Sequence, residues 1–286
     1  MARADDHVAQ PLTTRMMNSY SPPVDQLLTL GHPRPWREPW ADYLAMGFTH
    51  EHVSELIRMV GDPALNDADG ESAEVWTPVH AWRTLGQLRA EAATEPLMKL
   101  LETERDDWVL NEVPRVLGLI GPAALGPARA RLDHEDEGVR LSAMSSLVEV
   151  AKEHRDAREE VVGILTGRLE RWPDQDPLTN AFLIGRLVDL GEASAAPLMK
   201  AAFDAGAVEL AWNGDWEDVQ VTLGLIPERT TPRPHYHLGL LEPATRGARS
   251  PGPPRTAPPS RAAGAQKKTK NRREAAKASR KRNRRK

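Results

Sequence analysis

The carboxylates of residues 62–76, DPALNDADGESAEVW, invite comparison with a calcium-binding loop. With the glycine of this segment at the centre of an EF-hand loop, Asp67 and Asp69 take ligand positions three and five. Leu65 and Trp76 then stand at the first and twelfth positions, and the twelfth position requires a bidentate glutamate. Because both anchoring positions fail, we predict a flexible acidic linker here.

The chain lacks cysteine and the recognisable motifs of nucleophilic catalysis and nucleotide binding. None of the 286 residues is cysteine, which excludes disulfides, cysteine-ligated zinc and iron–sulfur clusters. No Ser-His-Asp arrangement, phosphate-binding glycine loop or G-x-G-x-x-G fingerprint occurs, and we interpret the glycines of the string LGLIG, residues 117–121, as helix breaks. The sequence therefore predicts no catalytic, cofactor-binding or metal-binding residue.

Two arginines occupy the same register in successive helical segments. They are Arg83 and Arg115, and Glu112 lies one helical turn before Arg115. Stacked helices would place all three on one ridge, on the concave side where repeat proteins bind their partners. We predict a partner-binding groove at Arg83, Glu112 and Arg115, with solvated surface charges as the alternative.

Tryptophan is unusually frequent, with eight Trp against three Tyr and three Phe. Tryptophan often anchors interfaces, but it also packs at the junctions between repeats. Trp82 aligns with inward positions of the other repeats, namely Pro114, Met144 and Ile184. We therefore assign Trp82 to the core.

A repeat carries these side chains. Four similar segments begin at Thr77, Val109, Val139 and Thr179. They share Leu85, Leu117, Leu147 and Leu187, at intervals of 32, 30 and 40 residues. In the second copy, apolar residues fall at helical spacing up to Ile120, and Gly121 with Pro122 then breaks the helix. No segment alternates apolar and polar residues over strand length, so we predict an all-α protein built as a solenoid.

The repeat pattern resembles the short HEAT-like repeats named after the phycobilisome lyases. The resemblance rests on V-R-x-x-A-x-x-x-L, seen best as Val139, Arg140, Ala143 and Leu147, and it covers residues 77–204. It implies a right-handed α-solenoid of stacked antiparallel helix pairs. Related bacterial HEAT-like proteins often end in a cysteine-rich zinc motif, which this chain lacks.

Some HEAT-repeat proteins are di-iron hydroxylases that hold the metals with four His-Glu pairs. The two His-Glu dipeptides of this chain, His50-Glu51 and His134-Glu135, fall instead in predicted turns at helix starts. We interpret them as solvated residues that favour helix N-termini.

The chain divides into five predicted parts. They are a disordered leader (1–22), an atypical helical cap (23–76), HEAT-like repeats with a C-terminal cap (77–225), a Pro-rich linker (226–265) and a basic disordered tail (266–286). The segment Trp216–Leu223, capped by Asp215, closes the repeats. The paired Met16 and Met17 are an alternative start of the chain.

The net charge of −3 conceals two opposed parts. Of the 38 basic and 41 acidic residues, 16 basic and one acidic follow Glu242, which leaves 22 basic and 40 acidic before it. The tail is the strongest functional signal, and it predicts binding to RNA, DNA or another polyanion through phosphates. The predicted contacts are Lys267, Lys268, Lys270, Arg272, Arg273, Lys277, Arg280, Lys281, Arg282, Arg284, Arg285 and Lys286. The alternatives are that the tail neutralises the acidic body or only keeps the protein soluble.

Together these features predict a cytoplasmic, non-catalytic interaction scaffold or adaptor without a cofactor. A protein partner would bind the concave face, a nucleic acid the tail, and no membrane is involved. The alternative is an enzyme related to HEAT-repeat lyases or metal-dependent modifiers.

Overall fold

The computed structural model describes residues 20–35 and 37–233, and within these ranges every regular element is a helix. This confirms the all-α prediction for that part of the chain. The α-helices are α2 (Val53–Val60), α3 (Pro63–Asn66), α4 (Thr77–Gln87), α5 (Thr94–Thr103), α6 (Asp107–Ile120), α7 (Leu125–Ala130), α8 (Glu137–Glu153), α9 (Arg158–Leu169), α10 (Pro177–Asp189), α11 (Ala196–Asp204), α12 (Leu210–Asn213) and α13 (Trp216–Thr222).

Short 3-10 helices lead into several of the α-helices. They are η1 (Val24–Thr29), η2 (Leu44–Met46), η3 (His50–His52), η4 (Glu74–Trp76), η5 (Glu91–Ala93), η6 (Pro122–Ala124), η7 (Arg155–Ala157), η8 (Trp172–Asp174) and η9 (Ala193–Ala195). No described helix is long and apolar enough to span a bilayer.

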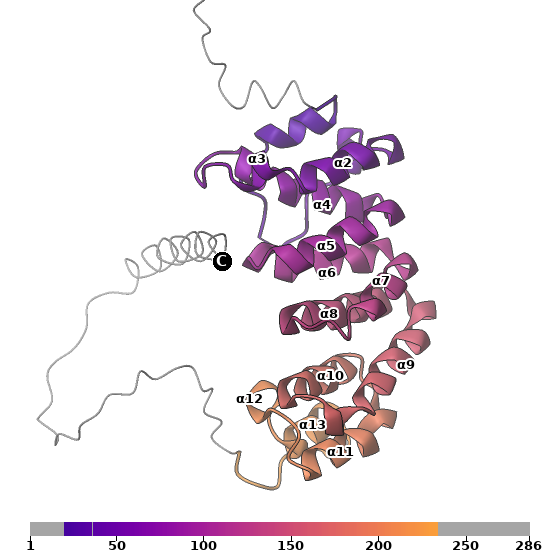
Figure 1. Ribbon diagram of the computed structural model, residues 1–286. Helices are drawn as coiled ribbons and strands as arrows, with labels where there is room; N and C mark the ends of the chain where they lie inside the picture. The colour runs from indigo at the N-terminus through magenta and orange to yellow at the C-terminus, as the bar shows by residue number, and fades with distance from the viewer. Residues whose placement is uncertain (1–19, 36, 234–286) are drawn as a thin grey trace, which may run out of the picture. The chain divides into compact units, whose positions relative to one another are not determined.

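The helices pack in the order of the chain. Helices α2, α4, α6, α8, α10 and α12 each contact the next member of this series, and Figure 1 shows them following one another from indigo to orange. Helices α5, α7 and α9 each pack against a member of this series. The four leucines shared by the similar sequence segments are fully buried between these helices. They are Leu85, Leu117, Leu147 and Leu187.

Aspartates start helices α6, α8 and α10, and two of these aspartates also bind an arginine from an earlier part of the chain. Asp106, Asp136 and Asp176 accept hydrogen bonds from the first backbone N–H groups of α6, α8 and α10. Arg105 donates to Asp136 over 2.6 Å, and Arg140 donates to Asp176 over 3.3 Å, across 31 and 36 positions of the chain. Asp136 and Asp176 thus each cap their own helix and bind an arginine that lies before it in the chain.

Two helix ends lie where the sequence places them. Helix α6 ends at Ile120, and Gly121 follows with a φ of 99°. Asp215 caps α13 and accepts a hydrogen bond from the N–H of Asp218. Gly118 departs from the prediction, because it lies inside α6 and breaks nothing. A Cβ at Gly118 would lie 2.7 Å from the Cβ of Glu149 on α8, so this glycine allows the close approach of the two helices.

Gly118→Ala is expected to lower the free energy of unfolding by about 1 to 3 kcal/mol, because α8 must shift to admit the methyl group. The matched control is Gly163→Ala in α9, where nothing lies within 4 Å of an added Cβ. That variant gains helix propensity and is expected to be more stable by about 0.5 to 1 kcal/mol. Urea unfolding measures both, and stabilisation by both alanines would contradict the close helix contact.

Two predicted boundaries are wrong by a few residues. Residues 20–22 belong to the folded part, because Tyr20 is buried and its hydroxyl donates to Asp62 over 2.7 Å. At the other end, residues 226–233 are not only linker, since Arg229 and Arg233 bind the first turn of α13. The rest of the predicted leader and linker lies outside the described residues.

Candidate peptide-binding ridge on α4 and α6

A segment without regular structure crosses helices α4 and α6. We call residues 31–35 and 37–43 the strap, and it joins η1 to η2. Three prolines in the strap prevent helix formation and favour an extended backbone. The strap runs from the N-terminal end of the helix stack toward α6 (Figure 1). It therefore covers the ridge on which the sequence analysis places Arg83, Glu112 and Arg115.

Side chains of α4 bind the backbone of the strap. His80 Nε2 lies 2.9 Å from the carbonyl oxygen of Gly31. Arg83 Nη2 donates to the carbonyl of Arg34 over 2.7 Å. Gln87 donates to the carbonyl of Ala41 over 2.7 Å and accepts from the N–H of Tyr43 over 2.9 Å. The spacing of His80, Arg83 and Gln87 places them on one face of α4, so that face holds an extended chain by its peptide groups.

Aromatic rings and guanidinium groups complete the contact. The guanidinium carbons of Arg115 and Arg83 lie 4.4 Å and 5.1 Å from the centre of the Trp40 ring. The His32 ring lies 4.3 Å from that of Trp76. Tryptophan is the aromatic ring that attracts a cation such as guanidinium most strongly. Trp40 is thus the side chain by which the strap is anchored to α6.

Beneath the strap, Arg83 and Glu112 form an ion pair at 1% and 0% exposure. Arg83 Nη2 donates to Glu112 Oε1, and Arg83 Nε donates to Oε2 over 2.9 Å. The same oxygen accepts a hydrogen bond from Trp82 Nε1 over 2.9 Å. This two-point pairing with a further indole donor supplies the hydrogen bonds that a buried carboxylate needs.

The structure brings the three predicted groove residues together, but it does not leave them all at the surface. Arg83 and Glu112 are buried, because the strap lies over them and they bind each other. Arg115 is half-buried against Trp40. Arg83 and Glu112 therefore do not line an open groove in the structure, whereas Trp82 is in the core, as predicted.

Sequence reasoning missed His80, Gln87 and Trp40. A local signal for the strap did exist, because residues 33–39 contain three prolines between two short helical patterns. No local signal pairs this segment with α4, since the hydrogen-bonded residues are separated by 44 to 49 positions.

Burial lowers the pKa of His80 to about 4, and the nearby Arg83 and His32 charges act in the same direction. His80 is therefore neutral at pH 7; its Nε2 donates to Gly31, and its Nδ1 accepts from the Tyr43 hydroxyl over 2.7 Å. Burial also raises the pKa of Tyr43.

Acidification is expected to destabilise the protein through His80. Between the unfolded pKa of about 6.5 and the folded value of about 4, the unfolded chain binds more protons, so stability falls as the pH falls. The loss is about 3 kcal/mol at pH 4 relative to pH 7.5. His80→Gln keeps a donor and an acceptor without titrating. Between pH 7.5 and pH 4, the unfolding free energy of this variant should fall by about 3 kcal/mol less than that of the wild type. Identical pH profiles of the two proteins would contradict this assignment.

The other candidate residues are dispersed. His50 and Glu51 lie in η3, and His134 and Glu135 lie in the turn before α8. In the acidic segment, Asp62 caps α3. Within the described ranges, no three His, Asp or Glu side chains gather as a metal site would require. The twelve predicted polyanion-binding residues, from Lys267 to Lys286, lie outside the described part.

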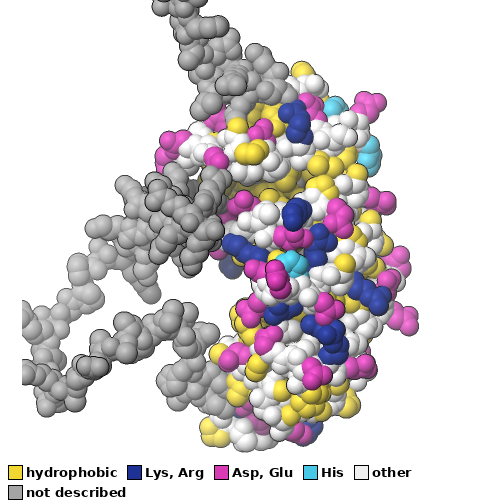
Figure 2. Space-filling model, in the orientation of Figure 1, with side chains coloured by type: hydrophobic (Ala, Val, Ile, Leu, Met, Phe, Trp, Pro, Cys, Tyr) yellow, Lys and Arg dark blue, Asp and Glu magenta, His cyan; other side chains and the backbone are white. Residues whose placement is uncertain are grey.

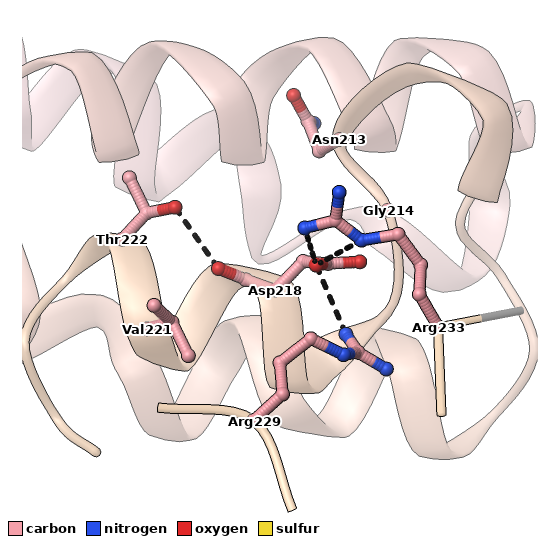
Figure 3. A pocket seen from close by; sticks show the side chains of 7 residues that line it. All are labelled: Asn213, Gly214, Asp218, Val221, Thr222, Arg229 and Arg233. Carbon is pink, nitrogen blue, oxygen red and sulfur yellow. Dashed lines mark hydrogen bonds and ion pairs between the residues drawn. The ribbon is translucent and has the colours of Figure 1, made fainter. Parts of the chain in front are cut away.

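A cavity of about 330 Å³ lies at the end of α12 and α13. Figure 3 shows Arg229 and Arg233 reaching Asp218 across it. Beside it, hydrogen bonds from Thr230 and Thr231 lower the pKa of Glu217 to about 2. The charged groups here bind one another.

Comparisons with models of known protein families, with curated proteins and with solved structures find no match to this chain.

Proposed function

We propose that this protein is a non-catalytic interaction scaffold whose α4–α6 ridge holds an extended protein segment and whose basic tail tethers it to a nucleic acid or another polyanion. In this proposal the helices form a right-handed α-solenoid of HEAT-like repeats in the cytoplasm. The observation that supports the proposal is the set of hydrogen bonds from His80, Arg83 and Gln87 to backbone carbonyls of the strap.

The chemistry of the ridge favours a binding surface over an ordinary core contact. Its side chains are Trp, Arg, His, Gln and Glu, which are polar or amphipathic. Water can therefore solvate them when the strap is displaced. Tryptophan and arginine are also the residue types that dominate binding energy at interfaces. In this view the strap is a built-in ligand, and a partner segment would replace it.

The partner segment should resemble the strap. Hydrogen bonds to backbone carbonyls accept any extended chain, whereas the Arg83 and Arg115 guanidinium groups select an aromatic ring. Prolines would keep such a segment extended and reduce the entropy lost on binding. We therefore expect an extended partner segment with a tryptophan among prolines.

A labelled peptide of residues 31–43 tests the ridge. It should bind the full-length Trp40→Ala variant about tenfold more tightly than the wild type, because loss of one cation–π anchor loosens the internal strap. Fluorescence anisotropy measures both affinities. Leu44→Ala changes an exposed residue just beyond the strap and should behave like the wild type.

A further variant links any binding to α4. Adding Gln87→Ala to Trp40→Ala removes two hydrogen bonds to the strap backbone, and it should lower the affinity for the peptide again. Equally weak binding to every variant, with intact helical circular dichroism, would overturn the ridge as a peptide-binding surface.

A further inference from the structure

Two tryptophans of the helix stack lie against the first part of the strap. Trp76 ends η4 and Trp108 lies in the first turn of α6, and their ring centres are 5.4 Å apart. The centre of the His32 ring lies 4.3 Å from that of Trp76 and 5.8 Å from that of Trp108. We call Trp76 and Trp108 the ring site, because both contact this one ring of the strap.

A backbone hydrogen bond determines where the ring of the strap falls. His80 Nε2 donates to the carbonyl of Gly31, the residue directly before His32, and Pro33 directly after it is buried. His32 itself is an exposed residue, so the helix stack does not enclose it. Figure 2 shows hydrophobic side chains at the surface near α3 and α4, so apolar surface is accessible at this end of the stack. Any extended segment can make the same backbone contact and present a side chain to the ring site.

The contacts of the ring site depend on a ring and not on a hydrogen-bonding group. His32 Nδ1 donates to the carbonyl of Pro33 over 2.7 Å, so this polar atom is used within the strap. The edge-on contact with Trp108, at 77°, is an arrangement that aromatic rings prefer. The guanidinium carbon of Arg83 already lies 5.6 Å from the centre of the Trp108 ring. The site therefore suits an uncharged planar ring better than an ammonium group, which would place a second positive charge beside Arg83.

We propose that the ring site is a second anchor of the α4–α6 ridge, and that it takes an uncharged planar ring of the partner segment. This inference rests on the proposed function, because it assigns the ring site to the same partner. The ring stands eight positions before the aromatic residue that Arg83 and Arg115 contact, which is the spacing of His32 and Trp40 in the strap. Two rings at a fixed spacing then select the partner, while the backbone hydrogen bonds accept any extended chain.

Labelled peptides of residues 31–43 test the ring site. The host is the full-length protein with His32→Ala and Trp40→Ala, so that its own strap lacks both rings. The unchanged peptide and a His32→Phe peptide should bind this host with similar affinity. His32→Ala and His32→Lys peptides should bind it about fivefold more weakly, because they lose the ring contacts. Fluorescence anisotropy measures the four affinities.

A change in the host links the difference to the ring site. Adding Trp108→Leu keeps an apolar side chain without an aromatic face, and the unchanged and His32→Ala peptides should then bind within twofold of each other. Trp172→Leu is the matched control, since it alters a partly buried tryptophan of η8 in a later part of the stack. That host should retain the fivefold difference.

The outcomes separate this inference from the proposed function. Equal affinities of the unchanged and His32→Ala peptides for the first host would overturn the ring site alone, because the ridge would still bind a peptide. Tighter binding of the His32→Lys peptide than of the His32→Phe peptide would overturn the preference for an uncharged ring. If no peptide binds any host, the proposed function fails and the ring site fails with it.

Discussion

Replacing Glu112 with alanine is expected to lower the free energy of unfolding by about 3 to 5 kcal/mol. The substitution leaves the buried guanidinium of Arg83 without its counter-charge and Trp82 Nε1 without its acceptor. Desolvation of an unpaired charge is the dominant cost, and it greatly exceeds the value of a surface ion pair. Urea unfolding followed by circular dichroism measures the loss. Asn111→Ala, at the exposed neighbouring position, should change stability by less than about 0.5 kcal/mol.

Removing both charges together should recover most of that loss. The double variant Arg83→Met with Glu112→Leu replaces the pair by apolar side chains of similar volume, which is often neutral or stabilising. Its strap loses the Arg83 hydrogen bond to Arg34, so peptide binding should weaken even where stability returns. A Glu112→Ala variant that loses less than about 1 kcal/mol would show that the pair is hydrated in solution.

Binding of the full-length protein to duplex DNA is expected to weaken by about 10³ to 10⁵ between 50 and 200 mM salt. The range follows if about 6 to 10 of the twelve basic residues from Lys267 to Lys286 contact phosphates. These residues include no aromatic side chain, so base stacking adds no salt-independent contribution to the binding free energy. Fluorescence anisotropy over a salt series measures the slope.

A chain that ends at Arg261 is the control for the tail. It lacks all twelve predicted contacts and should lose both the binding and its salt dependence. Unchanged retention of nucleic acid by this shortened chain would contradict the polyanion assignment and favour binding of the tail to the acidic body.

Much of the helical part was predictable because its signals are local. Gly121 with Pro122 ends α6, and Asp215 begins α13, through backbone conformation and hydrogen bonds within a few residues. The spacing of the buried leucines likewise identifies the buried face of each helix from residues within that helix. Gly118 escaped such reasoning, because its role depends on Glu149 of α8, a helix that begins 19 positions later in the chain.

The sequence by itself determined the helical class, the repeat, the absence of cysteine chemistry and the separation of an acidic body from a basic tail. These properties depend on composition and on contacts between near neighbours. Only the tertiary structure decided that Arg83 and Glu112 are buried, because the strap that covers them comes from 49 residues away and is held mainly through its backbone. Backbone groups are the same at every residue, so no sequence pattern could identify that partner.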